Sequence, residues 1–217
     1  MIPRFPVYLF DVDGTLVDSA ADICGAIQGV LHRNPPEQQV DEAFLRRYIG
    51  FHLNDLFSDL FPGITTQQLE RLVLEYRTIY PARNHSSTYL YPGVVEGLAK
   101  ISGRKSTATT KGTPMTRTVL EKFGLISYFD HVQGTDGFPC KPEPDIVFKS
   151  LEVFGAKPED CLLVGDAAPD MQAGRAAGVK ICAVDYGYGN LEEMKKFEPD
   201  YWISDLRELS ATTNGSR

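Results

Sequence analysis

The sequence predicts an α/β fold: a doubly wound parallel sheet with helices on both faces and a small helical domain inserted into it. Short apolar segments alternate with helical patterns over most of the 217 residues, which is typical of right-handed βαβ units. Residues 7–10 and 161–164 are continuously apolar, as expected for strands covered on both faces. Residues 19–80 show helical patterns only, and this interruption predicts the insertion.

Six segments are predicted as strands, at residues 7–10, 106–109, 131–133, 161–164, 180–184 and 201–203. Apolar residues at helical spacing predict helices at residues 94–102, 113–124, 146–154 and 171–177. Thr113 is a candidate cap with Pro114 at the first helical position, and the last three helices end at or before a glycine, as helices commonly do. This order of elements indicates a Rossmann-like sheet.

The inserted segment contains four amphipathic stripes, each ended by a proline or glycine. The stripes span residues 23–31, 44–49, 53–61 and 69–79. Thr65 and Gln68 resemble a capping box that opens the fourth helix, and Pro81 is expected to end it. We therefore predict a four-helix cap domain at residues 17–85, and an α/β core made of residues 1–16 and 86–217.

Composition excludes several classes of protein. The chain has 22 basic and 29 acidic residues, a formal net charge of −7 and a pI near 5.1, which disfavours nucleic-acid binding. Its four cysteines are far apart without a Cys-x-x-Cys pair, so we expect neither a zinc site nor a disulfide framework, and a reducing compartment. No apolar run approaches the roughly 20 residues of a membrane helix. We expect a cytoplasmic protein without a membrane partner.

Polar residues follow the predicted strands at the points where the strands end. They are Asp11, Asp13, Thr109, Thr110, Lys141, Asp166 and Asp170. Ligands of open parallel sheets bind at the carboxyl ends of the strands. We therefore expect these acids, hydroxyls and the lysine to converge on one edge of the sheet.

Four carboxylates in a small space repel one another, by about 4 kcal/mol for each pair about 4 Å apart at an effective dielectric constant of about 20. Either some of them stay protonated or a divalent cation neutralises them. Oxygen ligands without His or Cys favour Mg²⁺. Beside such a cation, Asp11 is a candidate nucleophile towards a phosphate ester, and Asp13 a candidate acid and base. Thr109 and Lys141 are candidates to hold the phosphoryl group.

Residues 11–19, Asp-Val-Asp-Gly-Thr-Leu-Val-Asp-Ser, resemble the first motif of the haloacid dehalogenase-like hydrolase superfamily. Thr109, Lys141 and residues 165–170 match its second, third and fourth motifs in order, and the inserted helices match its helical cap. The resemblance covers about residues 5–210. An acid such as Asp13 distinguishes the phosphatases of this superfamily from its dehalogenases.

The resemblance implies a role for each of these residues. Asp11 would be the nucleophile and a metal ligand, and Asp13 the acid and base whose backbone carbonyl also meets the metal. Thr109, with Thr110 beside it, and Lys141 would bind the phosphoryl group. Asp166 would bind Mg²⁺, and Asp170 would support it directly or through water.

Three further segments, residues 91–93, 123–125 and 186–189, resemble the phosphoglycolate phosphatase branch of the superfamily. Thr110 stands where this branch usually has Asn, so the resemblance does not define the fine substrate preference. We expect an Mg²⁺-dependent phosphomonoester hydrolase that forms an aspartyl phosphate and acts on a small organic phosphate such as 2-phosphoglycolate. The alternatives are a sugar-phosphate phosphatase, a pyrophosphatase and a β-phosphoglucomutase-like enzyme.

A signalling module that accepts a phosphoryl group on Asp is a more remote alternative, because such modules lack an acid like Asp13 and a helical insertion. The expected partner is a small phosphorylated metabolite, and the expected assembly a monomer or homodimer. In the cap, Arg46 and Arg47 are expected on a solvated helix face rather than at the substrate, and His52 is the histidine that we single out for the site. Residues 16–19 and 84–89 are the expected hinges.

Overall fold

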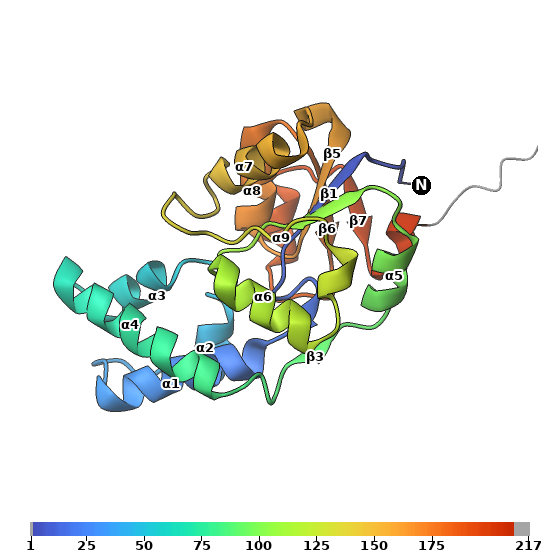
Figure 1. Cartoon of the computed structure of the whole chain (residues 1–217). Helices are drawn as coiled ribbons and strands as arrows, with labels where there is room; N and C mark the ends of the chain where they lie inside the picture. The colour runs from blue at the N-terminus through green and yellow to red at the C-terminus, as the bar shows by residue number, and fades with distance from the viewer. Residues whose placement is uncertain (1, 211–217) are drawn as a thin grey trace, which may run out of the picture.

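The computed structural model describes residues 2–210 as an α/β core with a group of helices at one end (Figure 1). The core contains a five-stranded parallel sheet in the order β4-β1-β5-β6-β7. Its strands are β1 (Val7–Phe10), β4 (Arg104–Thr107), β5 (Cys161–Gly165), β6 (Lys180–Val184) and β7 (Tyr201–Ile203). Because β1 lies between β4 and β5, its carboxyl end lies between theirs.

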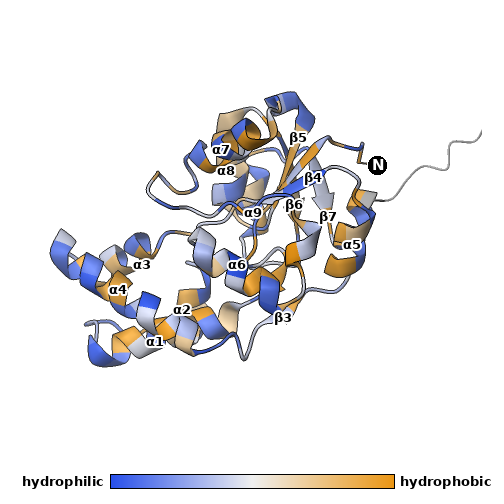
Figure 2. Cartoon of the chain, viewed as in Figure 1, coloured by the Kyte–Doolittle hydropathy of each residue, from blue (hydrophilic) through white to orange (hydrophobic). Residues whose placement is uncertain are grey.

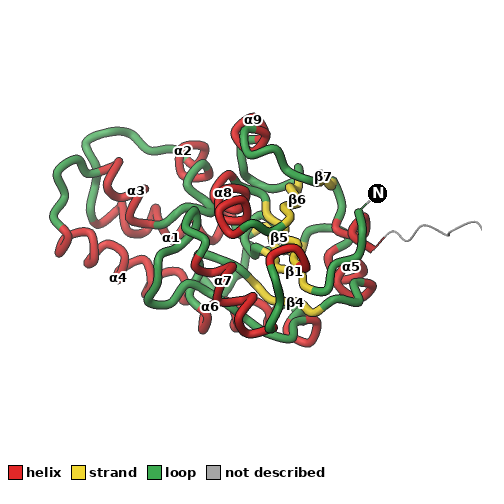
Figure 3. The backbone as a smooth tube through the Cα atoms, turned by 90° about the horizontal axis from the view of Figure 1, so that it is seen from above, coloured by secondary structure: helices red, strands yellow, loops and turns green. Residues whose placement is uncertain are grey.

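Helices cover both faces of this sheet, which confirms the predicted doubly wound fold (Figure 3). Tyr8 and Phe10 of β1 pack into one apolar cluster, and Val7 and Leu9 pack into a second cluster on the opposite face. The first cluster includes residues of α5 (Val94–Lys100) and α6 (Thr113–Lys122). The second includes residues of α7 (Asp145–Phe154), α8 (Ala168–Ala177) and α9 (Leu191–Lys195).

The predicted strand at residues 131–133 is wrong in the structure. The segment makes only isolated parallel bridges, Ser106 with His131 and Thr109 with Gly134. Between these bridges, the Thr107 hydroxyl donates to the Gln133 carbonyl and accepts from the Gln133 N–H, both at 2.9 Å. The Thr107 side chain thus bonds the backbone groups of Gln133 that a neighbouring strand would otherwise bond. The neighbouring strand β4 begins two residues earlier than predicted and ends at Thr107.

The inserted segment forms four helices, α1 (Ala20–Arg33), α2 (Glu42–Arg46), α3 (Leu53–Leu60) and α4 (Thr66–Ala82). They enclose an apolar core of their own, and α1 and α4 carry both apolar and polar faces (Figure 2). The capping box of Thr65 and Gln68 is present. No helix within residues 2–210 is both long and apolar enough to cross a membrane.

Pro81 does not end α4, contrary to the prediction. It lies inside the last turn, and the Asn84 N–H donates to the Pro81 carbonyl at 2.9 Å. The fixed φ of proline is compatible with a helix, so the residue costs one backbone hydrogen bond without stopping the turn.

A two-stranded antiparallel ribbon, which the sequence does not reveal, connects the helical insertion to the core. Strand β2 (Val17–Asp18) pairs with β3 (Tyr89–Leu90), with Val17 opposite Leu90. Each strand has only two residues, too few to show a periodicity. The predicted hinge segment 16–19 contains β2, and the segment 84–89 ends at the first residue of β3. The boundaries at residues 17 and 85 remain a prediction.

Candidate active site

The loop after β1 turns sharply against the end of β5. The Asp11 N–H donates to the Val164 carbonyl at 2.9 Å, so Asp11 continues the β1–β5 ladder. Gly14 has a φ of +91°, and a Cβ placed there would lie 2.1 Å from Oδ2 of Asp166. Only glycine allows both this backbone conformation and this approach. The turn therefore brings the Asp11–Asp13 loop against Asp166.

Three buried carboxylates meet at this edge of the sheet. Asp11, Asp166 and Asp170 are each 2% exposed, and each offers a carboxylate oxygen within 4.8 Å of the other two. Nζ of Lys141 lies between two of them, 2.7 Å from Oδ1 of Asp11 and 2.5 Å from Oδ1 of Asp170. Four of the residues predicted from the strand ends are thus brought together.

The electrostatics of this cluster fit a divalent cation. Burial raises the pKa of Asp11 to about 7; the ammonium of Lys141 opposes the shift, while Asp170 and Asp13 add to it. Burial, followed by the charges of Asp11 and Asp170, raises the pKa of Asp166 well above its ordinary value. When ionised, three carboxylates and one ammonium leave two uncompensated negative charges. Buried oxygen donors of this charge and spacing suit a hard cation such as Mg²⁺.

Asp166 and Asp170 are held by hydrogen bonds that fix their orientation. Asp166 accepts from the Thr15 hydroxyl at 3.1 Å and from the Tyr188 N–H at 2.9 Å. Oδ2 of Asp170 accepts from the Ala167 N–H at 3.1 Å, at the start of α8, while its Oδ1 contacts Lys141. Asp170 therefore caps a helix and belongs to the acidic cluster at the same time.

Asp13 faces a different set of partners. The Ser19 hydroxyl donates to its Oδ1 at 2.6 Å, and Nζ of Lys111 lies 3.2 Å from its Oδ2. Lys111 also donates to the Tyr80 hydroxyl of α4 at 3.1 Å. Burial lowers the pKa of Lys111, but the charge of Asp13 and the interactions with Tyr80 and Tyr76 together outweigh burial, and the net shift is upward. Asp13 thus lies at a contact between the core and the helical insertion, held by a hydroxyl group and an ammonium group.

Thr109 and Thr110 lie beyond the end of β4, the strand next to β1. Thr109 is buried and its hydroxyl accepts from the Lys111 N–H at 3.3 Å. Thr110 lines the cavity above the sheet edge. Within residues 2–210, neither side chain is hydrogen-bonded to the acidic cluster, so these two residues share the sheet edge with the acids without contacting them.

Several neighbours of the site were not among the predicted site residues. Thr15 and Ser19 contact Asp166 and Asp13, and both lie in the first motif, where their spacing to the acids was visible. The Tyr188 hydroxyl donates to Asp18 at 2.8 Å and accepts from the Ser19 N–H at 2.7 Å. No local pattern in the sequence links Tyr188 to these residues, because the contact spans 170 positions.

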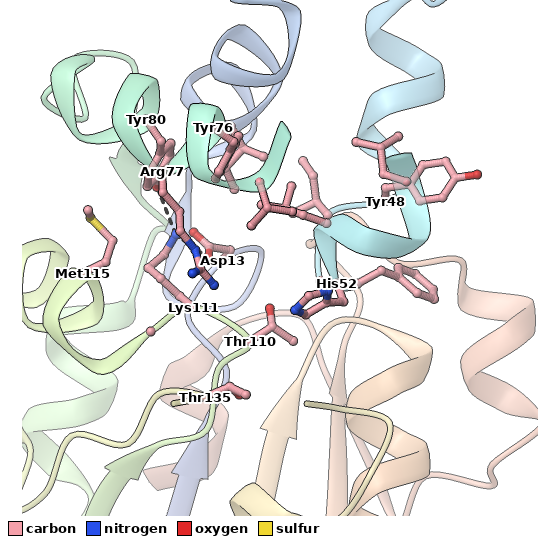
Figure 4. Close-up of a pocket in the computed structure, with 18 of the residues that line it drawn as sticks. Asp13, Tyr48, His52, Tyr76, Arg77, Tyr80, Thr110, Lys111, Met115 and Thr135 are labelled. Carbon is pink, nitrogen blue, oxygen red and sulfur yellow. Dashed lines mark hydrogen bonds and ion pairs between the residues drawn. The ribbon is translucent and has the colours of Figure 1, made fainter. Parts of the chain in front are cut away.

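A cavity of about 600 Å³ opens between the core and the helical insertion (Figure 4). Asp13, Thr110 and Lys111 line its core side, and aliphatic and aromatic residues of α1, α3 and α4 line the opposite side. His52, the histidine singled out from the sequence, lines the cavity. Arg46 lies on the surface and pairs with Glu42 at 2.9 Å, which confirms the solvated face expected for it.

Buried aspartates at the carboxyl edge of a parallel sheet, beneath a helical insertion, form a hydrolase-type site built on carboxylates. A family model described as haloacid dehalogenase-like hydrolase matches residues 8–184. The chain belongs to this family.

Named relatives and solved structures agree with this assignment. The chain is 32% identical over 218 residues to the phosphoglycolate phosphatase of Nitrosococcus oceani, with 96% of each chain covered. It is 31% identical over 205 residues to the pyrophosphatase PpaX of Bacillus cereus, with 93% of each covered. A haloacid dehalogenase-like hydrolase from Bacteroides fragilis superimposes with a TM-score of 0.89 at 30% identity, covering 95% of this chain and all of that one.

Proposed function

We propose that the protein is an Mg²⁺-dependent phosphomonoester hydrolase that acts on a small organic phosphate such as 2-phosphoglycolate. The observation that carries the proposal is the contact of Lys141 with Asp11 inside a cluster of three buried carboxylates. Relatives named phosphoglycolate phosphatase support the substrate. We also propose that it works in the cytoplasm, as a monomer or homodimer, with residues 17–85 as its cap.

Asp11, Asp166 and the backbone carbonyl of Asp13 would hold the metal, with Asp170 supporting it directly or through water. When bound, Mg²⁺ would neutralise charge, so that a phosphate dianion can approach the carboxylate of Asp11. Lys141 holds that carboxylate by one oxygen and compensates part of its charge. Thr109 and Thr110, at the same edge, would donate to phosphoryl oxygens.

In the first step a carboxylate oxygen of Asp11 forms a bond to phosphorus, and the bond between phosphorus and the ester oxygen breaks. The leaving oxygen takes a proton from Asp13. In the second step Asp13, now a carboxylate, takes a proton from a water molecule that attacks phosphorus, which frees Asp11 and releases inorganic phosphate. Lys111 and the Ser19 hydroxyl contact the two carboxyl oxygens of Asp13 and orient this group for both proton transfers.

A panel of phosphate esters ranked by kcat/KM, with and without Mg²⁺, tests the proposal. The panel contains 2-phosphoglycolate, sugar phosphates, pyrophosphate and p-nitrophenyl phosphate. We expect Mg²⁺-dependent release of phosphate, with 2-phosphoglycolate first. Pyrophosphate is the second candidate, because one relative of similar identity is named a pyrophosphatase. Phosphorylation of the protein without turnover would instead indicate a signalling module.

A further inference from the structure

Arg77 projects from α4 into the cavity between the core and the helical insertion. Figure 4 shows its side chain extending towards the space beside Lys111 and Asp13, with His52 facing the same space from the other side. Arg77 is exposed, so a ligand in the cavity can reach it. Most of the surrounding side chains of the insertion are aliphatic or aromatic, which makes this guanidinium a distinctive polar group on that wall.

The other charged groups of the cavity wall are already used within the protein. Asp13 pairs with Lys111. The carboxylate of Asp136 accepts from the Thr113 N–H at 3.0 and 3.2 Å, at the start of α6. Arg77, by contrast, has no hydrogen bond or ion pair with any residue in the described range 2–210. Its charge is therefore available to a ligand.

His52 adds a second donor of defined direction. Its Nδ1 accepts from the Asn54 N–H at 3.1 Å, where His52 caps the start of α3. Because Nδ1 is an acceptor, the neutral ring carries its proton on Nε2. Burial lowers the pKa of His52, Asp55 opposes the shift, and the charge of Arg77 lowers it further. The Nε2–H group is thus a neutral donor that lies within the electrostatic reach of Arg77.

We propose that Arg77 and His52 form a subsite on the cap that binds a second anionic group of the substrate, and so select phosphate monoesters with an anion at each end. In 2-phosphoglycolate the second anionic group is the carboxylate. The planar guanidinium presents paired donors that match a carboxylate or a phosphate, whereas the imidazole adds a single N–H. The phosphoryl end meets the residues of the core, and the second anion meets the cap. This inference rests on the proposed function and names the residues that determine its specificity.

The test compares two esters that differ in this group alone, 2-phosphoglycolate and 2-hydroxyethyl phosphate. The measured quantity is the ratio of their kcat/KM values in the full-length protein with Mg²⁺. Arg77→Met should lower this ratio by about 10- to 100-fold, as expected for the loss of a charge-assisted hydrogen bond, and Arg77→Lys should restore part of it. His52→Gln should lower the ratio less, because a neutral donor is lost.

Arg71→Met is the matched control. Arg71 is an exposed arginine of the same helix, and it contacts Asn34 instead of lining this cavity. The Arg71→Met substitution removes the same charge from α4. An unchanged ratio of kcat/KM values in this variant would show that Arg77 acts by direct contact with the substrate and not by long-range attraction.

Calorimetric binding of the two esters to an Asp11→Asn variant gives a readout that does not require turnover. We expect tighter binding of 2-phosphoglycolate, and loss of this preference when Arg77→Met is added. An equal ratio in the wild-type protein and Arg77→Met, or an equal fall in Arg71→Met, would overturn the subsite. Absence of Mg²⁺-dependent hydrolysis of p-nitrophenyl phosphate by the wild-type protein would instead overturn the proposed function.

Discussion

Replacing Lys141 with methionine removes the ammonium group that contacts both Asp11 and Asp170. The side chain of Lys141 is 1% exposed, and those of its two partners are 4% and 2% exposed. Removing one partner of a buried ion pair costs about 3–5 kcal/mol, because the remaining charge is left without compensation. Methionine is unbranched and of similar length, so loss of packing should contribute little.

For a chain of this length, about 1 kcal/mol corresponds to roughly 2–4 °C in Tm. We therefore expect Lys141→Met to melt about 6–20 °C below the wild-type protein at pH 8 in EDTA. The loss should depend on pH. Without the ammonium, the pKa of Asp11 rises further above its unfolded value of about 4. Between the unfolded-state pKa and the folded-state pKa of Asp11, the folded state binds more protons than the unfolded state. The free energy of unfolding therefore falls as pH rises through this range.

The assay is urea or thermal unfolding of both proteins at pH 5 and pH 8 in EDTA, with Lys157→Met as control because Lys157 is exposed. The loss should be larger at pH 8 than at pH 5, and turnover should fall by about 10²–10³-fold, as when a donor to a developing charge is removed. A destabilisation below about 1 kcal/mol, or an equal loss at both pH values, would refute the assignment of Lys141 as the compensating charge.

Three further predictions concern the chemistry. Asp11→Asn should abolish turnover while Tm is retained, because a carboxamide of similar shape is a poor nucleophile; substantial activity would remove Asp11 from that role. Asp13→Asn should lower the turnover of 2-phosphoglycolate by about 10²–10⁴-fold. The loss should be smaller for p-nitrophenyl phosphate, whose leaving group needs less protonation. Equal losses on these two esters would leave Asp13 a positioning role only. EDTA should abolish activity, and added Mg²⁺ should restore it. Ca²⁺ should restore activity poorly, because its coordination shell is larger and less rigid. Full activity in excess EDTA would contradict the metal site.

Prediction from sequence succeeds at the sheet edge because strand ends are local features. Asp11, Asp166 and Asp170 each follow a strand whose position the apolar pattern reveals, and the parallel arrangement brings their carboxylates together. Lys141 was placed beyond residues 131–133, which form no strand, so its contact with Asp11 does not follow from a strand end. Thr109 reaches the same edge, although nothing in its hydrogen bonding shows a ligand role.

The features that escape prediction depend on contacts between distant segments. Residues 131–133 have the composition of a strand, but a threonine side chain satisfies their backbone instead. Arg77 follows apolar helix positions in the sequence and looks like part of a solvated face. Only the placement of α4 over the core makes it part of a cavity wall. Similarly, the β2–β3 pairing joins residues more than 70 positions apart.

That ribbon has a mechanical consequence. The chain passes between the core and the helical insertion twice, and both passages run through paired strands. We therefore expect them to act as one joint with a single axis instead of two independent connections. A body turning about one axis moves least near the axis and most at its far end. Tyr80, near the end of α4, contacts Lys111 of the core. We expect this contact to persist as the insertion turns, while His52, at the start of α3, moves away from the core. Opening would then separate the two ends of the cavity in a fixed order, and the wall around His52 would move away from the core first.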